Sequence, residues 1–445
     1  MVMKRVVDPV GSWFPIPFFS RGAAIALAAG LLTTACQNPP SEGGASSPNG
    51  ASGSSSNGLK IGSLLPATGD LSPIGQEMIQ AVPLLVETVN QCGGVNGQPV
   101  TLVAEDDQTD PRAGTQAMAK LAEVDRVGGV VGSFASSVSS AAVDVAVRNK
   151  VPMVSPGSTS PVFTERAAKG DFGGYWARTA PPDDYQAAAL AQLAKDRGFT
   201  RVSTVVINND YGVGFEKQFV AAFKKLGGTV INESNPTRYD PNATTFDTEA
   251  AAAFANKPEA VAAVLYAETG SLLLKSAYQQ GLMDGVQVML TDGVQSEEFP
   301  KQVGQTSDGK FILQNAIGTV PGASGAALAD FTKLWQEKKG KAPGAYVPHT
   351  WDATALIALA AQAAQSNDGE AIAAKLRDVA NAPGQEVTDV CEGLKLLASG
   401  QDINYQGASG NVDLDANGDV VGAYDVWTVQ ENGGIGVVGK VNPAL

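Results

Sequence analysis

VVGSFASSVSSAAVDVAVRNKVPMVSPGSTSP, residues 130–161, is the stretch from which the architecture can be inferred. Two apolar runs, Val130-Val131 and Val151–Val154, each end in a turn rich in serine and threonine, and an Ala/Val-rich helix lies between them. Two adjacent parallel strands would then end side by side at the carboxyl edge of one sheet, where open α/β folds bind ligands. A helix beginning near Ser136–Ser139 would direct free N–H groups to that edge, which favours a small anion such as a carboxylate. One such turn is explained as well by helix capping, but two in succession favour binding.

The rest of the chain continues the alternation of strand and helix in two series. The first series has strands at Lys60–Leu65 and Val100–Ala104, and the second begins with a helix at Tyr185–Arg197. Further strands are predicted at 202–207, 229–231, 260–266, 286–290, 311–315 and 424–429. Further helices are predicted at 215–226, 246–256, 271–280, 326–338, 350–365, 370–381 and 387–397, with a hairpin at 411–421. This alternation predicts parallel sheets with right-handed crossovers. Segments 178–184 and 318–322 break it and are predicted to cross between two domains.

Composition excludes several classes of function. The chain has 445 residues and a formal net charge of -14, whereas nucleic acid binding requires a basic face. It contains one histidine and three cysteines, so no metal site with His/Cys spacing is predicted and no cofactor is expected. A Ser-His-Asp triad would have to use His349, for which packing or capping is the favoured role. We therefore expect a binding protein and not an enzyme.

The N-terminus has the pattern of an export signal. Basic residues precede the short apolar run Ala23–Leu32, and small residues lead to Cys36. This arrangement resembles a bacterial lipoprotein signal, in which Cys36 would be lipidated and become the mature N-terminus. The alternative is an ordinary cleaved signal with a chance cysteine. Residues 37–58 are rich in Pro, Ser, Gly and Asn and are expected to form a flexible tether.

Two cysteines remain if Cys36 carries a lipid. An exported compartment permits a disulfide, and we predict that Cys92 and Cys391 form one. Two unrelated buried thiols are the alternative.

The order of motifs resembles the leucine/isoleucine/valine-binding group of type I periplasmic binding proteins over about 59–427, most closely the cyanobacterial neutral amino acid receptors. The pieces that carry the resemblance are IGSLLPATGDLSPIG (61–75), VNQCGGVNG (89–97), EDDQTDP (105–111), VVGSFASS (130–137), VPMVSPGSTSP (151–161), RTAPPDDYQ (178–186), NNDYGVGF (208–215), LTDG (290–293) and SGNVDLDANGDVVGAYDVW (409–427). The resemblance implies an α/β fold of two Rossmann-like lobes joined by a three-strand hinge. It places the signal peptide at 1–36, the N-terminal lobe at 59–178 and 318–405, and the C-terminal lobe at 179–317 and 406–445.

The resemblance also implies a ligand site for an amino acid. The first lobe would hold the α-carboxylate through Ser136 and Thr159, with Phe134 and Gly157 beside them. The second lobe would hold the α-ammonium through acidic and aromatic groups, namely Asp292, Tyr211 and the less surely aligned Glu268, with Asp183 as a further acidic group. Ile74 stands where some branched-chain receptors have tyrosine, which indicates a different side-chain pocket.

The function implied is that of a solute receptor of an ABC importer that binds an amino acid, expected to be neutral, between its lobes. Its partners would be the permease subunits, and its place the periplasm, attached to a bacterial membrane through the lipid only. Three alternatives stay open: the same fold binding urea, a short amide or a branched-chain amino acid; a ligand-sensing receptor domain; and an amide hydrolase. The absence of a transmembrane or signalling segment before Leu445 argues against the sensing domain, and the absence of a G-x-S-x-G motif argues against the hydrolase.

Overall fold

The computed structural model describes residues 58–441. The predicted signal segment, Cys36 and nearly all of the predicted tether lie outside these residues. No helix between 58 and 441 is both long and apolar enough to cross a membrane.

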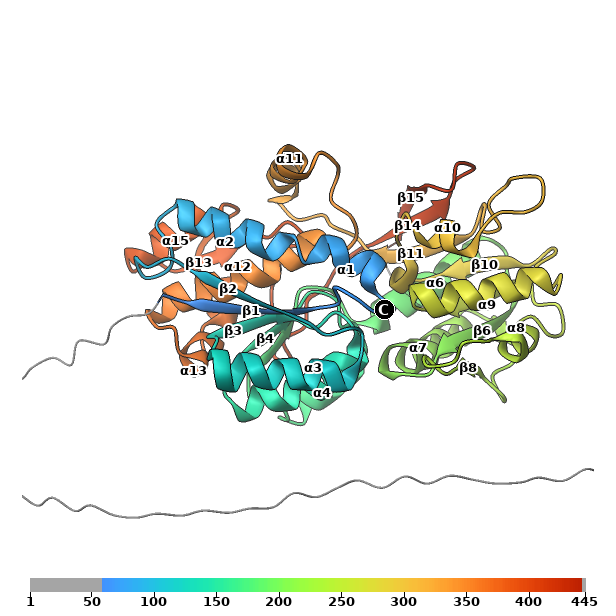
Figure 1. Ribbon diagram of the computed structural model, residues 1–445, viewed down its shortest axis with the longest axis horizontal. Coiled ribbons are helices and arrows are strands. Elements are labelled where there is room, and N and C mark those ends of the chain that lie inside the picture. The colour runs from blue at the N-terminus through green and yellow to red at the C-terminus, as the bar shows by residue number, and fades with distance from the viewer. Residues whose placement is uncertain (1–57, 442–445) are drawn as a thin grey trace, which may run out of the picture. The chain divides into compact units, whose positions relative to one another are not determined.

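The first lobe is built on a five-stranded parallel sheet in the order β2-β1-β3-β4-β5 (Figure 1). Its strands are β1 Lys60–Leu65, β2 Thr101–Asp106, β3 Gly129–Gly132, β4 Met153–Ser155 and β5 Trp176–Arg178. The helices between them are α1 Ser72–Met78, α2 Ala81–Gln91, α3 Pro111–Ala119, a π-helical turn Lys120–Asp125, α4 Ser136–Arg148 and α5 Val162–Ala168. Helix α2 lies on one face of the sheet and α3 and α4 lie together on the other (Figure 1). The predicted strand–turn–helix–strand unit of residues 130–161 is therefore confirmed.

The second lobe has an eight-stranded sheet in the order β15-β14-β11-β10-β9-β6-β7, with β8 also paired to β6. Its strands are β6 Arg201–Ile207, β7 Thr229–Val230, β8 Thr237–Tyr239, β9 Ala260–Val264, β10 Gln287–Leu290, β11 Ile317–Pro321, β14 Tyr424–Val429 and β15 Ile435–Val441. Strands β6 to β11 are parallel, and β14 and β15 are antiparallel. Its helices are α6 Asp183–Asp196, α7 Asp210–Lys225, α8 Asp247–Ala253, α9 Ala267–Gln279, the 3₁₀ turn Asp292–Val294 and α10 Phe299–Val303.

The segment between β11 and β14 returns to the first lobe. It contains α11 Leu328–Lys339, α12 Val347–Ala364, α13 Gly369–Ala373, α14 Leu376–Ala380, β12 Gln385–Val387, α15 Val390–Ala398 and β13 Ile403–Tyr405. Helix α12 is buried along almost its whole length and packs against α2 and the first sheet. The predicted disulfide between Cys92 and Cys391 is confirmed, and it joins the end of α2 to α15.

Three connections join the lobes, and hydrogen bonds link them to one another. They are residues 179–182, 322–327 and 406–423. Ser324 N–H donates to the Ser409 carbonyl at 3.0 Å, and Arg178 N–H donates to the Gly418 carbonyl at 2.9 Å. Asp352 on α12 anchors the third connection by accepting the N–H groups of Ala408 and Ser409, at 2.9 and 2.7 Å.

Three sequence-based expectations about elements were wrong. Residues 311–315 do not form a strand but part of a turn. Residues 318–322 were predicted as a crossing, but most of them belong to β11, because their apolar side chains are buried in the second sheet. Residues 411–421 contain a turn held by Asp415 and Asp419, but they form an irregular loop and not a hairpin, because the flanking Leu414 bonds to Arg377 and Asn381 of the first lobe and not to an opposite strand. Strand β15 was missed, because its outward side chains are largely exposed and give no apolar alternation.

Candidate functional site

Serine side chains form hydrogen bonds between the two turns that follow β3 and β4 in the first lobe. Ser155 Oγ donates to the Ser133 carbonyl at 2.6 Å, and Ser158 Oγ lies 2.8 Å from Ser139 Oγ. These hydroxyls therefore have a structural role. Ser136, at the start of α4, accepts the Ser160 N–H at 3.2 Å, and the buried Thr159 Oγ1 has no hydrogen-bond partner among the described residues.

A second group of polar side chains comes from strand ends of the second lobe. Asp292 follows β10 and is 3 % exposed. Its Oδ1 accepts the Tyr211 hydroxyl at 2.8 Å, and that hydroxyl also lies 2.7 Å from Thr291 Oγ1. Tyr211 is placed by the N-terminus of α7, where Asn209 caps the helix by accepting the Gly212 N–H at 3.0 Å. Its ring stacks on Tyr266, with centroids 5.6 Å apart.

The two groups face each other across a small cavity. Its lining contains six of the eight residues that the resemblance predicted for the ligand site: Phe134, Ser136, Gly157, Thr159, Tyr211 and Asp292. The other lining residues are Leu71, Tyr266 and Gly293. Hydroxyl donors of the first lobe thus lie opposite a carboxylate of the second lobe. This pairing suits a ligand that carries both charges.

Asp183 lies directly behind Thr159. Its N–H donates to the Thr159 carbonyl at 2.8 Å, and its side chain is completely buried. Neither carboxylate oxygen has a hydrogen-bond partner among residues 58–441. A buried carboxylate without a partner is costly, because burial removes water and nothing replaces it.

The neighbouring cation is already paired. Arg178 is the one lysine or arginine that is buried in the described part of the chain. Its Nε donates to Asp419 Oδ1 at 2.7 Å, and Nη1 donates to the carbonyls of Ser158 and Ser160 at 2.9 and 3.0 Å. Asp292 lines the cavity, whereas Asp183 lies behind Thr159 and is not among the lining residues; neither has a basic side chain of its own among residues 58–441.

Electrostatics support this description. Burial is the largest cause that raises the pKa of Asp183, and the charge of Asp292 raises it further, while the nearby Thr159 hydroxyl and the charge of Arg178 oppose that rise. Burial also raises the pKa of Asp292, while the hydroxyls of Tyr346 and Tyr211 oppose that rise. A cation bound at this place would lower both pKa values, because it favours the ionised carboxylates.

Glu268 does not reach the cavity. Its side chain is exposed, and its backbone N–H donates to Asp70, which follows β1 in the first lobe. Asp70 also accepts the N–H of Thr269 at 3.1 Å and its hydroxyl at 2.6 Å. The N-terminus of α9 is thus capped by a carboxylate from the opposite lobe. Tyr266, two residues earlier, is the residue of this turn that lines the cavity.

Sequence reasoning missed Tyr346. This residue precedes α12 in the first lobe, and its hydroxyl donates to Asp292 Oδ2 at 2.7 Å across the cavity. Its ring meets Phe134 edge-on, with centroids 4.8 Å apart. Its φ of 63° places it in the left-handed region, which is rare for tyrosine. The sequence signal was only an aromatic residue before a helix, which is too common to select.

Other acidic and histidine side chains have ordinary structural roles. Asp415 accepts the N–H groups of Asn417 and Asp419 at 2.7 and 2.9 Å. No cluster within 58–441 has the ligands to hold a metal ion. His349 is buried, which lowers its pKa to about 3, and its Nδ1 has no partner among the described residues. The acid–histidine contact of a triad is therefore missing.

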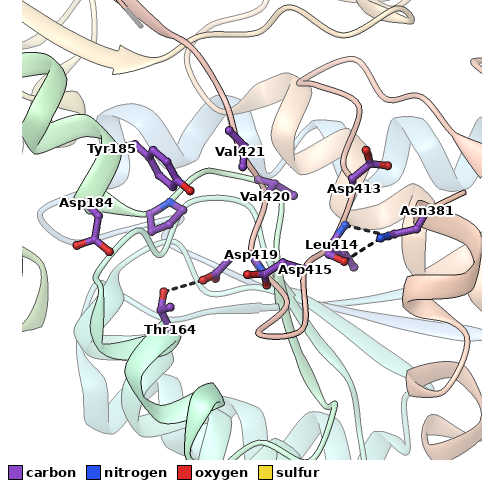
Figure 2. A pocket seen from close by; sticks show the side chains of 11 residues that line it. Thr164, Asp184, Tyr185, Asn381, Asp413, Leu414, Asp415, Asp419, Val420 and Val421 are labelled. Carbon is purple, nitrogen blue, oxygen red and sulfur yellow. Dashed lines mark hydrogen bonds between the residues drawn. The ribbon is translucent and has the colours of Figure 1, made fainter. Parts of the chain in front are cut away.

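A second pocket lies on the hinge side. Figure 2 shows its lining, in which Thr164 donates to Asp419 at 2.6 Å and Asn381 pairs with the backbone of Leu414 through two bonds of 2.9 Å. These bonds hold the third connection onto the first lobe. None of the predicted site residues lines this pocket.

Comparison with known proteins agrees with the fold. The family described as "Receptor family ligand binding region" matches residues 77–432. The substrate-binding protein BasB of a chemotactic signal transduction system in Halobacterium salinarum is 28% identical over 382 residues, which cover 84% of this chain and 88% of that protein. Leu/Ile/Val-binding protein homolog 1 of Brucella abortus is 29% identical over 325 residues, 72% of this chain and 82% of that protein.

Solved structures give the same result. The leucine binding protein LivK from Thermotoga maritima superposes with a TM-score of 0.71 at 26% identity, covering 86% of this chain and 99% of that one. LivJ from Streptococcus pneumoniae, solved with isoleucine, has a TM-score of 0.70 at 19% identity, covering 87% of this chain and 100% of that one, and supports the fold alone. Because the family model matches most of its length, the chain belongs to the receptor family ligand-binding regions, a family of binding proteins, and it has the two-lobed fold of type I periplasmic binding proteins.

Proposed function

We propose that the chain is the solute-binding protein of an ABC importer and that it holds the zwitterion of an amino acid between its lobes. One observation carries the proposal. The buried carboxylate of Asp292 lines a cavity whose opposite wall supplies hydroxyls and a helix N-terminus, a second buried carboxylate, Asp183, lies behind the lining residue Thr159, and neither carboxylate forms an ion pair among the described residues. An amino acid supplies an ammonium group for the carboxylates and a carboxylate for the hydrogen-bond donors.

Each end of the ligand has its own set of groups. The carboxylate binds to the hydroxyls of Ser136 and Thr159 and to the N-terminus of α4. The ammonium binds to Asp292, which Tyr211 orients, and to Asp183. Because the anchors for the two ends lie on different lobes, the ligand stabilises the closed state more than the open one. The closed form is then the state that docks on the permease.

The names of the relatives support this assignment. The Brucella protein is named as a Leu/Ile/Val-binding protein homolog, and the Thermotoga protein as a leucine-binding protein. For this chain we propose export to the periplasm and attachment to the membrane through a lipid on Cys36. Mass spectrometry of the mature protein tests the lipid, since an ordinary cleaved signal leaves an unmodified N-terminus.

Titration calorimetry with a panel of amino acids tests the binding function. We expect at least one to bind with a Kd below about 1 mM, which corresponds to about -4 kcal/mol. Two matched compounds serve as controls for the best ligand: its amide, which lacks the carboxylate, and its deaminated acid, which lacks the ammonium. Binding of either compound as tight as that of the amino acid contradicts the zwitterion site.

Urea and short amides remain the rival ligands for this fold. They carry no charge, so they leave Asp183 and Asp292 unneutralised. Tight binding of urea or acetamide, with no amino acid bound, would favour them over the proposal.

A further inference from the structure

The lining residues divide by chemistry, which shows where the ligand's side chain must go. On the proposed function, Ser136, Thr159, Tyr211 and Asp292 hold the two charged ends. The residues left to surround a side chain are Leu71, Phe134, Gly157, Tyr266 and Gly293. They are the less polar part of the lining, called the apolar corner below, and its large groups are one leucine and two aromatic rings.

This corner has little free space. The cavity contains about 200 Å³ of atom-free volume, part of which is open to solvent. The charged ends of the ligand and its side chain must share this volume. Each atom that a longer side chain adds therefore has to displace the walls further.

The walls are held in place from behind. The Phe134 ring lies against Gly157, so closely that a Cβ there would be 2.3 Å from the ring. Its other side meets Tyr346, whose hydroxyl is bonded to Asp292. Leu71 directly follows Asp70, the residue that caps α9 of the opposite lobe. Moving Phe134 or Leu71 therefore disturbs a contact between the lobes.

Moving the lobes apart as a whole disturbs the same contacts. Side-chain hydrogen bonds cross from the first lobe to the second, among them those of Asp70 with the Thr269 hydroxyl at 2.6 Å, Tyr346 with Asp292 at 2.7 Å, and Ser160 with the Asp210 carbonyl at 2.8 Å. Such bonds tolerate only a few tenths of an ångström of separation before they weaken. A bulky ligand would thus bind to a cleft that is not fully closed.

We propose that Leu71 and Phe134 limit the ligand's side chain, so that glycine, alanine and serine bind in preference to leucine and isoleucine. This inference rests on the proposed function, because it assumes that the charged ends occupy the polar groups. The proposed preference differs from the branched-chain amino acids that the names of the relatives mention.

Calorimetry with those five amino acids on the purified protein tests the limit. We expect the best of glycine, alanine and serine to bind at least tenfold more tightly than leucine. Equal or tighter binding of leucine or isoleucine overturns the size limit but leaves the proposed function standing. Failure of every amino acid to bind overturns both.

Variants test which residue restricts the size of the ligand's side chain. Leu71→Ala enlarges the corner, and we expect the ratio of alanine affinity to leucine affinity to fall at least fivefold. Leu84→Ala is the matched control, since Leu84 is a buried leucine of α2 away from the cavity, and it should leave the ratio unchanged. An unchanged ratio in folded Leu71→Ala protein contradicts the role of Leu71. If that variant does not fold, Phe134→Leu, which shortens the other wall, decides by the same ratio.

Discussion

Asp183 and Asp352 are both completely buried, yet their surroundings are opposite. Asp352 accepts the N–H groups of Ala408 and Ser409 and the hydroxyl of Tyr405, at 2.9, 2.7 and 3.0 Å. No described residue donates a hydrogen bond to the carboxylate of Asp183. The carboxylate of Asp352 therefore holds the hinge together. The carboxylate of Asp183 is buried at a cost to the stability of the fold, and a role in binding would explain that cost.

Replacing each residue by asparagine should give effects of opposite sign. Asp183→Asn removes an unpaired buried charge, so the ligand-free protein should melt at a higher temperature. Its affinity for the amino acid should fall at least tenfold, because losing one partner of a desolvated charge pair costs about 2–5 kcal/mol. Asp352→Asn leaves donors unsatisfied and should lower the free energy of unfolding by about 1–3 kcal/mol.

Thermal melts and calorimetry on the two variants measure both effects. The comparison also controls for general damage, since Asp352→Asn is the more disruptive change for the fold. If the Asp183→Asn protein melts at a lower temperature than the wild type and binds the ligand equally well, Asp183 has no role in binding.

At the scale of elements, the helix α9 receives its N-cap from another lobe. An N-cap is usually supplied by the residue just before the helix, as Asp110 does for α3 by accepting the N–H groups of Arg112 and Ala113. For α9 that place is taken by Tyr266, whose side chain faces the cavity, and the cap comes from Asp70. Opening of the lobes would therefore also remove this cap.

Asp70→Ala should therefore affect ligand release. Losing an N-cap costs about 0.5–2 kcal/mol, and because the cap forms only on closure, this should appear as a 2- to 30-fold faster dissociation of the ligand. Asp110→Ala is the matched control, whose cap lies within one lobe and should lower stability without changing dissociation. Stopped-flow displacement measures the rates, and equal rates in both variants would contradict a cap formed on closure.

How far the sequence predicts these elements depends on whether their signal is local. The turns around Ser136 and Thr159 follow apolar strands directly, so their place at one sheet edge could be predicted from the chain alone. Tyr346 could not be found in this way, because its importance comes from Asp292, 54 residues away in sequence. Asp70 shows the same limit, since an aspartate in a turn also has a common local role.

For the whole molecule, the buried carboxylates predict a dependence on pH with two opposite parts. Burial raises the pKa of Asp107 and of Asp352 to about 6, and burial also raises the pKa values of Asp183 and Asp292. A carboxyl whose pKa is higher in the folded state than in the unfolded chain stabilises the fold below its unfolded pKa of about 4, and this contribution is lost as the pH rises through the folded value.

The ligand-free protein should consequently melt at a higher temperature at pH 5 than at pH 7.5. Ligand binding should respond in the opposite direction, because the ammonium requires ionised carboxylates, so the increase in melting temperature caused by a saturating amino acid should shrink at pH 5. Asp107 does not line the cavity, and its contact is with the Ser133 hydroxyl. Asp107→Asn should therefore weaken the first effect and leave the second intact. Melting curves at both pH values, with and without ligand, separate the two. A ligand-induced shift that grows on acidification would mean that the buried carboxylates do not hold the cation, because protonation removes the charge that attracts it.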